Sequence, residues 1–270
     1  VTVGVFDVLT GKTVYLKAGD PTDRYFTNIA WSPDNKVIYM FELNRDQNDC
    51  RLVSYNAETG DKIAELYRET DEKYVEPLHP IQFLPWDSNK FIMQSQKDGY
   101  NHLYLCEVKN EERRAKNSNT ESSNNSSSAE QENSSLFTHH SSLNIRQLTS
   151  GKWVVMDVLG FYPKHKSIVI ASNECSPIQR NIFLVDALSG KRTMVDANGE
   201  GWHNATLSES GKYIYDNYST PTVPRKIAII NNELGDRIPY FTAENPWKGY
   251  NVPEYSCGTI KAADGVTDLY

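Results

Sequence analysis

The sequence lacks two features that would identify large classes of protein. It has no apolar run approaching the roughly 18 residues that a membrane-spanning helix needs. It has no dense cluster of lysine and arginine, and the group nearest to one is Arg113, Arg114 and Lys116. With a net charge of −7, the chain would be repelled by a nucleic-acid backbone. We therefore expect no membrane span in this chain and no nucleic-acid partner.

Cysteine is also scarce, and its spacing excludes the common metal and redox motifs. The four cysteines, Cys50, Cys106, Cys175 and Cys257, lie far apart in the sequence. We interpret them as single thiols on strands, buried or half-buried, although one disulfide stays open. His139 and His140 are adjacent, so a strand would point them apart, and no third ligand lies near them. We expect no metal site and no cofactor.

What the sequence does contain is a repeat. Four lysines each follow a turn-like stretch and open a short apolar run: Lys36, Lys90, Lys166 and Lys212. An Asp or Asn followed by Gly four residues later recurs as well: Asp7 with Gly11, Asn56 with Gly60, Asp186 with Gly190, and Asn231 with Gly235. Without a polar tract at 110–142, the repeat length is about 40–50 residues, which is typical of one four-stranded propeller blade.

We therefore predict an all-β fold, a β-propeller fragment of about four four-stranded antiparallel blades in an open or partial ring. The end of a preceding blade lies before them. The predicted strands are 26–31, 37–42, 51–55 and 62–67; 81–84, 91–95, 102–108 and 145–148; 154–160, 168–172, 181–185 and 192–195; and 203–207, 213–217, 226–230 and 237–241.

The composition divides the chain further. We assign the partial propeller to 1–242, with the Ser- and Asn-rich tract 110–142 as a disordered insertion, because such a tract buries too little apolar surface to offset its ordering entropy. Residues 243–258 are predicted to be a linker. Residues 259–270 have the pattern of a strand and hairpin that no longer belongs to the repeat.

Three segments carry a resemblance to a known family. They are Ser95-Gln-Lys-Asp-Gly-Tyr-Asn-His-Leu-Tyr104, Gln147-Leu-Thr-Ser-Gly-Lys-Trp-Val-Val155 and Gly201-Trp-His-Asn-Ala-Thr-Leu-Ser208. The chain resembles the propeller of the dipeptidyl peptidase IV group of the prolyl oligopeptidase family of serine peptidases. The resemblance implies an eight-bladed propeller that caps an α/β-hydrolase domain and forms a funnel over its active site. It also implies release of N-terminal dipeptides, commonly after proline, and identifies 259–270 as the first, truncated strand of the hydrolase domain.

The family's catalytic machinery has no counterpart in this chain. Its nucleophile lies in a Gly-x-Ser-x-Gly elbow, and no glycine here has a serine two positions later. The adjacent pair Glu111-Glu112 is flanked by nothing that matches the family's substrate-binding glutamates. We expect no catalytic residue and an inactive chain, with the serine peptidase activity in the protein's hydrolase domain.

The resemblance indicates Tyr74 and His79 as candidate substrate-cavity residues, because the comparable loop in relatives faces the substrate. Ordinary packing of a loop stiffened by two prolines is the competing interpretation. Trp153, Trp202 and His203 lie at matching entry points of later blades, and we interpret them as blade-packing residues.

Three readings of function stay open. The first is a propeller segment of a peptidase, whose partners are peptide substrates and its own hydrolase domain. The second is a TolB-like propeller that binds proteins and has no peptidase domain, and the third is a relative that has lost its triad. Exposed blade edges could also pair two copies into a homodimer. The resemblance implies a periplasmic or secreted location.

Overall fold

The computed structural model describes residues 2–20, 22–112, 139–253 and 256–270. Two compact units form: residues 1–75 with 106–144, and residues 76–105 with 145–270. Within these described ranges the regular elements are strands, apart from the single 3-10 turn Pro163–His165 (η1). The predicted all-β class is confirmed.

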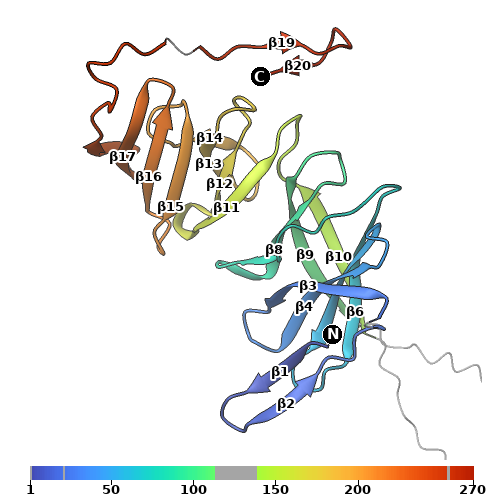
Figure 1. Cartoon of the computed structure of the whole chain (residues 1–270). Coiled ribbons are helices and arrows are strands. Elements are labelled where there is room, and N and C mark those ends of the chain that lie inside the picture. Colours follow the sequence, from blue (N-terminus) through green and yellow to red (C-terminus); the bar gives the residue numbers. More distant parts are fainter. Residues whose placement is uncertain (1, 21, 113–138, 254–255) are drawn as a thin grey trace, which may run out of the picture. The chain divides into compact units, whose positions relative to one another are not determined.

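The first unit contains one complete blade and a hairpin (Figure 1). The hairpin pairs β1 (Gly4–Asp7) with β2 (Lys12–Tyr15). The blade is an antiparallel sheet in chain order, with strands β3 (Arg24–Trp31), β4 (Val37–Asn44), β5 (Asp49–Asn56) and β6 (Lys62–Thr70). That this hairpin is the end of a preceding blade stays a prediction.

The second blade is interrupted by the polar tract. Its strands are β7 (Gln82–Leu84), β8 (Asp87–Ser95), β9 (His102–Glu112) and β10 (His139–Gln147). Strands β9 and β10 run into the ends of the tract predicted to be disordered, whose middle, 113–138, lies outside the described residues. Lys90 lies inside β8, because Leu84 already pairs with Asp87 across a tight turn. The prediction placed this strand start too late, since Asp87, Ser88 and Asn89 have low strand propensity.

Two further blades follow within the second unit. The third consists of β11 (Val155–Tyr162), β12 (Ser167–Ser172), β13 (Asn181–Asp186) and β14 (Arg192–Met194). The fourth consists of β15 (Trp202–Leu207), β16 (Tyr213–Thr220), β17 (Val223–Asn231) and β18 (Asp236–Thr242). After them, β19 (Ile260–Lys261) and β20 (Asp268–Leu269) form a short hairpin. Its assignment to a hydrolase domain stays a prediction.

Strand β12 shows how the blades of the second unit stack. All six of its residues are buried. Ile168 and Ile170 enter a core cluster with Ile92 and Leu103 of the second blade. Val169 and Ala171 point the other way, into a cluster with Ile214 of the fourth blade. Successive side chains of a strand alternate between faces, so this continuous apolar run supplies two cores at once.

The repeated Asp/Asn-to-Gly marker forms the same turn each time. The glycine N–H donates to the backbone carbonyl of the Asp or Asn at 2.8–2.9 Å. The Asp or Asn side chain accepts hydrogen bonds from the N–H groups of the two residues directly before the glycine, as Asp186 does from Leu188 and Ser189. Each of these glycines has a positive φ between 69° and 75°. The marker is therefore local turn chemistry.

Candidate functional site

Tyr74 and His79 lie in the segment between β6 and β7. Tyr74 is 61% exposed, and its neighbour Val75 is buried and donates its N–H to the Gln47 carbonyl at 2.7 Å. His79 is half-buried. The division between the two units falls after Val75, so the two side chains do not form one site within either unit. Their role in substrate contact stays a prediction.

The blade-packing interpretation fits Trp153 and not Trp202. Trp153 packs against the core of the second and third blades and meets the His102 ring edge-on, with 4.8 Å between ring centroids. Trp202 is 41% exposed and, with Asn217 and Arg225, lines a surface pocket. It remains accessible because it points away from the third blade, to a face that no other blade of the described part of this unit covers.

His203 lies in a buried polar cluster beneath residues 195–201. The imidazole and the carboxylate of Asp216 are both fully buried, with Nδ1 2.8 Å from Oδ2. Asp216 also accepts from the Ala197 N–H at 3.0 Å. Asp196 accepts from the Asn181 side chain at 2.9 Å and from the Gly199 N–H at 2.7 Å. These contacts fix the 195–201 loop to the third and fourth blades.

The His203–Asp216 pair is arranged like a general base and the carboxylate that orients it, but the imidazole cannot accept a proton. His203 Nε2 is 2.9 Å from the Glu200 carbonyl, to which it donates, so no lone pair is free to accept a proton from a nucleophile. The ring is also sealed from solvent. We conclude that the pair stabilises the loop and does not catalyse.

Arg180 connects the third and fourth blades and was not identified from the sequence. Its N–H donates to the Gly201 carbonyl, and its own carbonyl accepts from the His203 N–H, both at 3.0 Å. Its guanidinium donates to the His203 carbonyl through Nη1 and to Asp157 Oδ2 through Nη2, the latter at 2.8 Å. The residue is only 7% exposed. The sequence signal that could have identified it is weak: an arginine that directly precedes a strand with an apolar centre, Asn181–Asp186.

Beside this arginine is a pocket of about 410 Å³ between β11 and β15. Asp157 and Arg180 contribute its charges, and the Asp157 side chain is 52% exposed. The other lining residues come from the same two strands: Val158, Leu159, Asn204, Ala205, Thr206 and Leu207. The pocket places one solvent-accessible carboxylate beside apolar side chains, and we take it as a candidate binding site in the second unit.

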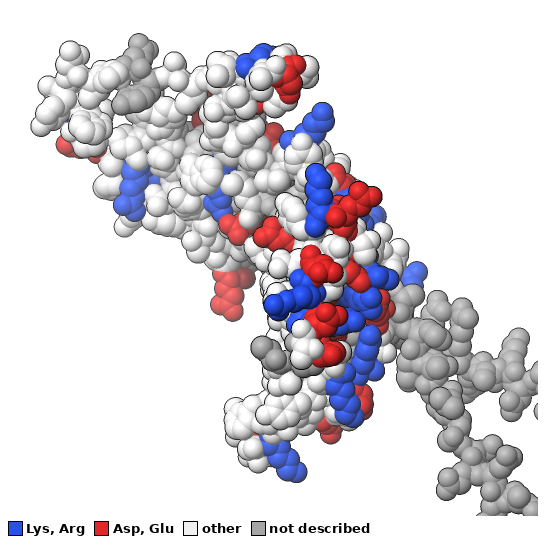
Figure 2. Space-filling view, turned by 45° about the vertical axis from the view of Figure 1, so that its right-hand side comes forward, with Lys and Arg blue, Asp and Glu red and all other residues white. Residues whose placement is uncertain are grey.

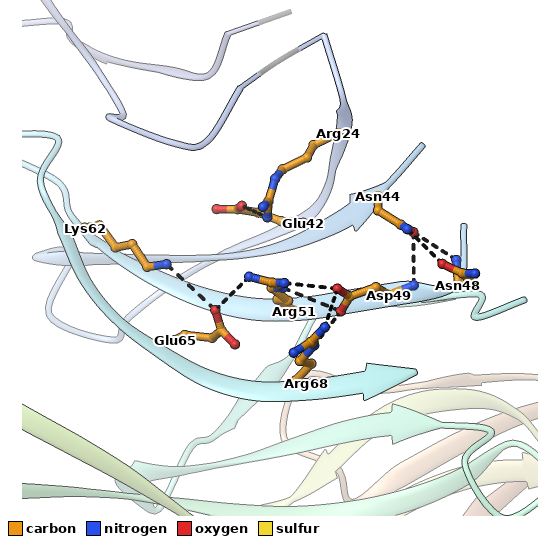
Figure 3. Close-up of polar contacts among 9 residues, drawn as sticks. All are labelled: Arg24, Glu42, Asn44, Asn48, Asp49, Arg51, Lys62, Glu65 and Arg68. Carbon is orange, nitrogen blue, oxygen red and sulfur yellow. Dashed lines mark hydrogen bonds and ion pairs between the residues drawn. The ribbon is translucent and has the colours of Figure 1, made fainter. Parts of the chain in front are cut away.

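The first unit has a different polar group, shown in Figure 3. Asp49 on β5 receives two hydrogen bonds of 2.8 Å from Arg68 and two, of 3.0 and 3.5 Å, from Arg51. Hydrogen bonding by Arg68 is the main cause that lowers the pKa of Asp49 to about 2, and burial opposes it. Arg51 also reaches Glu65 at 3.4 Å. Because these charges satisfy one another, we interpret the group as structural.

The thiols are only partly as predicted. None of the four forms a disulfide; Cys50 and Cys106 are buried on strands, whereas Cys175 and Cys257 are exposed and lie outside strands. Burial raises the pKa of the Cys50 thiol to about 12, so it is unreactive at neutral pH. Among the described residues, no group of three or more His, Cys, Asp or Glu side chains could hold a metal ion.

The surface gives no sign of a single-sign charged face in the view of Figure 2, where acidic and basic side chains lie next to one another. In the described part of the chain, no helix is long and apolar enough to cross a membrane.

Comparison with known proteins places these features in context. Residues 1–225 match the family model described as the dipeptidyl peptidase IV N-terminal region. A Neosartorya fischeri protein described as a dipeptidyl-aminopeptidase B is 24% identical over 233 residues, which are 81% of this chain and 21% of that protein. The Trichophyton equinum dipeptidyl peptidase 4 is 21% identical, over 94% of this chain and 30% of its own.

Two solved structures share the fold. A Bacteroides ovatus protein described as a dipeptidyl aminopeptidase IV is 43% identical, with a TM-score of 0.79, over 99% of this chain and 36% of that chain. Porphyromonas gingivalis dipeptidyl peptidase 4 is 20% identical, with a TM-score of 0.74, over 99% of this chain and 33% of its own. The chain thus spans about a fifth to a third of the length of these relatives.

Proposed function

Because this chain belongs to the family of dipeptidyl peptidase IV N-terminal regions, we propose that it is the non-catalytic propeller segment of a serine-type dipeptidyl aminopeptidase. The complete protein releases N-terminal dipeptides, with a preference for Xaa-Pro. The observation that carries this proposal is the family match over residues 1–225.

The sequence and the buried polar pair support a non-catalytic role for this chain. No Gly-x-Ser-x-Gly elbow occurs in the sequence, and the buried His203–Asp216 pair has no free nitrogen lone pair. The hydrolytic step therefore belongs to a hydrolase domain that follows the propeller, and this chain supplies binding surface.

The segment lines and gates the route that peptides take to the active site. Each blade begins with a strand that has a partner on one side only, such as β11 and β15. In a propeller, such first strands surround the central channel. The pocket between β11 and β15 supports a role in contacting peptide, and the exposed Tyr74 is a second candidate contact. An enzyme of this kind acts on extracellular peptides, so we place the protein in the periplasm or outside the cell.

Chromogenic dipeptide substrates test the proposal. The 270-residue chain is expected to release no p-nitroaniline from Gly-Pro-p-nitroanilide, whereas the complete protein releases it and loses this activity to a serine-directed phosphonate. The complete protein is also expected to hydrolyse the Gly-Leu analogue much more slowly. Robust hydrolysis by the purified chain, or none by the complete protein, would contradict the proposal. The second result would favour a binding propeller without peptidase activity.

A further inference from the structure

We propose that the pocket between β11 and β15 is a subsite for a basic side chain, lysine or arginine, of an extended peptide. The inference extends the proposed function, because it assumes that peptides pass the first strands of the blades. It assigns a chemical preference to residues downstream of the dipeptide that is released.

The charge that faces solvent in this pocket is a carboxylate. Asp157 Oδ2 is fixed by Arg180 Nη2 at 2.8 Å, whereas Oδ1 has no protein partner among the described residues. The Asp157 side chain is 52% exposed, but that of Arg180 is only 9% exposed. The guanidinium thus orients the carboxylate from behind, and an incoming group meets Asp157 Oδ1. A carboxylate held in one orientation loses less entropy when a cation binds.

Strand β11 is irregular at the pocket. Its register with β12 shifts between Val155 and Asp157 and again between Val158 and Gly160, so two bulges flank the Asp157–Val158 pair. Bulges redirect side chains and are frequent beside binding sites. Gly160 follows with φ 140°, and a Cβ on it would lie 3.0 Å from Leu207 of β15. Gly160 therefore lets β11 approach β15 closely, and Leu159 and Leu207 from these two strands both line the pocket.

The remaining lining residues match the stem of a long basic side chain. Val158, Leu159, Ala205 and Leu207 are apolar and partly buried, and they can cover methylene groups. Lysine and arginine bury such stems while their charged ends stay hydrated or paired. Asn204 and Thr206 are exposed on β15 and offer further polar groups. A ligand with a negative end is disfavoured, because the exposed charge is the Asp157 carboxylate and the Arg180 side chain is only 9% exposed.

Binding of blocked peptides to the 270-residue chain tests the subsite without any hydrolysis. The probes are acetyl-Ala-Leu-Lys-Leu-Ala-amide and its norleucine counterpart, with affinity measured by calorimetry. The lysine peptide is expected to bind about two- to fivefold more tightly, a difference typical of one partly exposed ion pair. Asp157→Asn should abolish the difference, whereas Asp236→Asn, an exposed carboxylate on β18, should preserve it.

A second variant protects the test from a folding defect, because Asp157→Asn leaves Arg180 without its counter-ion. Thr206→Arg adds a guanidinium at an exposed strand position that lines the same pocket, and it should block the lysine peptide while the thermal transition is retained. Equal affinities for the two probes, or preference retained in the folded Thr206→Arg variant, would overturn the subsite.

An unblocked Ala-Leu-Nle-Leu-Ala-amide that binds as tightly as the lysine probe would also overturn it, because the pocket would then take a peptide amino terminus. None of these outcomes depends on peptidase activity. Failure of the subsite is therefore distinguishable from failure of the proposed function.

Discussion

At the scale of single residues, the two buried histidines differ in the partners of their ring nitrogens. His203 has an acceptor at each nitrogen, the Asp216 carboxylate at Nδ1 and the Glu200 carbonyl at Nε2. A neutral imidazole has only one N–H, so the geometry requires imidazolium. His102 has the Thr149 hydroxyl at Nδ1 and the Gly151 carbonyl at Nε2, and a hydroxyl can donate. A neutral ring therefore satisfies His102 but not His203.

The charged state of His203 predicts a pH-dependent stability. Burial alone would lower the pKa of His203, but the hydrogen bond and charge of Asp216, helped by Asp196, outweigh burial and raise the pKa above 6.5. A group whose pKa is raised on folding stabilises the fold most when it is protonated in both states. The contribution is thus complete below pH 6.5 and is lost as the pH rises through the higher folded pKa.

Urea unfolding at pH 6 and pH 9 measures this effect. His203→Gln should lower the free energy of unfolding at pH 6 by about 3 kcal/mol, since it leaves a buried carboxylate without its cation. The variant should also lose less stability between pH 6 and pH 9 than the wild-type chain. His165→Gln, at an exposed position, should keep the wild-type profile. A His203→Gln profile parallel to that of the wild-type chain would refute the imidazolium assignment.

At the scale of elements, the turn between the third and fourth strands also contacts the preceding blade in some repeats. A Cβ on Gly190 would lie 2.6 Å from the Leu148 carbonyl oxygen, at the end of the second blade. Gly235 forms the same turn with the same φ of 73°, but nothing lies within 4 Å of the Cβ position. The two glycines are therefore matched in backbone conformation and differ only in contact.

Substituting each glycine by alanine therefore distinguishes the cost of backbone strain from the cost of disturbing the contact between blades. Gly235→Ala should cost about 1 kcal/mol, the penalty for a left-handed backbone with a side chain. Gly190→Ala should lower the free energy of unfolding by the same backbone penalty and, in addition, by the cost of displacing the Leu148 carbonyl. The total should exceed about 3 kcal/mol, because the turn and the neighbouring blade must both shift. Thermal or urea unfolding of both variants provides the comparison. Equal losses would show that the contact with Leu148 does not restrain the turn.

Local chemistry explains which elements could be predicted from the sequence. The Asp/Asn-to-Gly turns and the buried runs, such as Ser167–Ser172, depend on residues close in sequence, and the prediction located them. The start of β8 and the extension of β9 and β10 were missed, because polar residues paired with neighbouring strands override their low propensity. The Asp157–Arg180 pair depends on bulges and on contact between blades, which no local pattern encodes.

At the scale of the whole molecule, the fourth blade leaves one face uncovered within the described residues of its unit. Ile214 and Ile230 point to the third blade and are buried. The opposite face carries Tyr213 and Tyr215 of β16 and Ile238 and Phe241 of β18, which are 39–58% exposed. Contiguous apolar surface of this kind is a site of association. Pro239 lacks an N–H and weakens pairing along the edge of β18, so the face is the better contact.

We therefore propose that the isolated chain self-associates through this face, and light scattering tests the proposal. The weight-average mass should rise with concentration above the monomer mass of 30.7 kDa. Ile238→Lys combined with Phe241→Glu should return the chain to a monomer, because the charged groups would have to be desolvated in the contact. Leu9→Lys is the control, since Leu9 is 93% exposed at the turn of the β1–β2 hairpin in the other unit. If the wild-type chain stays monomeric at every concentration, the apolar face alone does not drive association. If an oligomer forms and the double substitution does not affect it, the contact lies elsewhere.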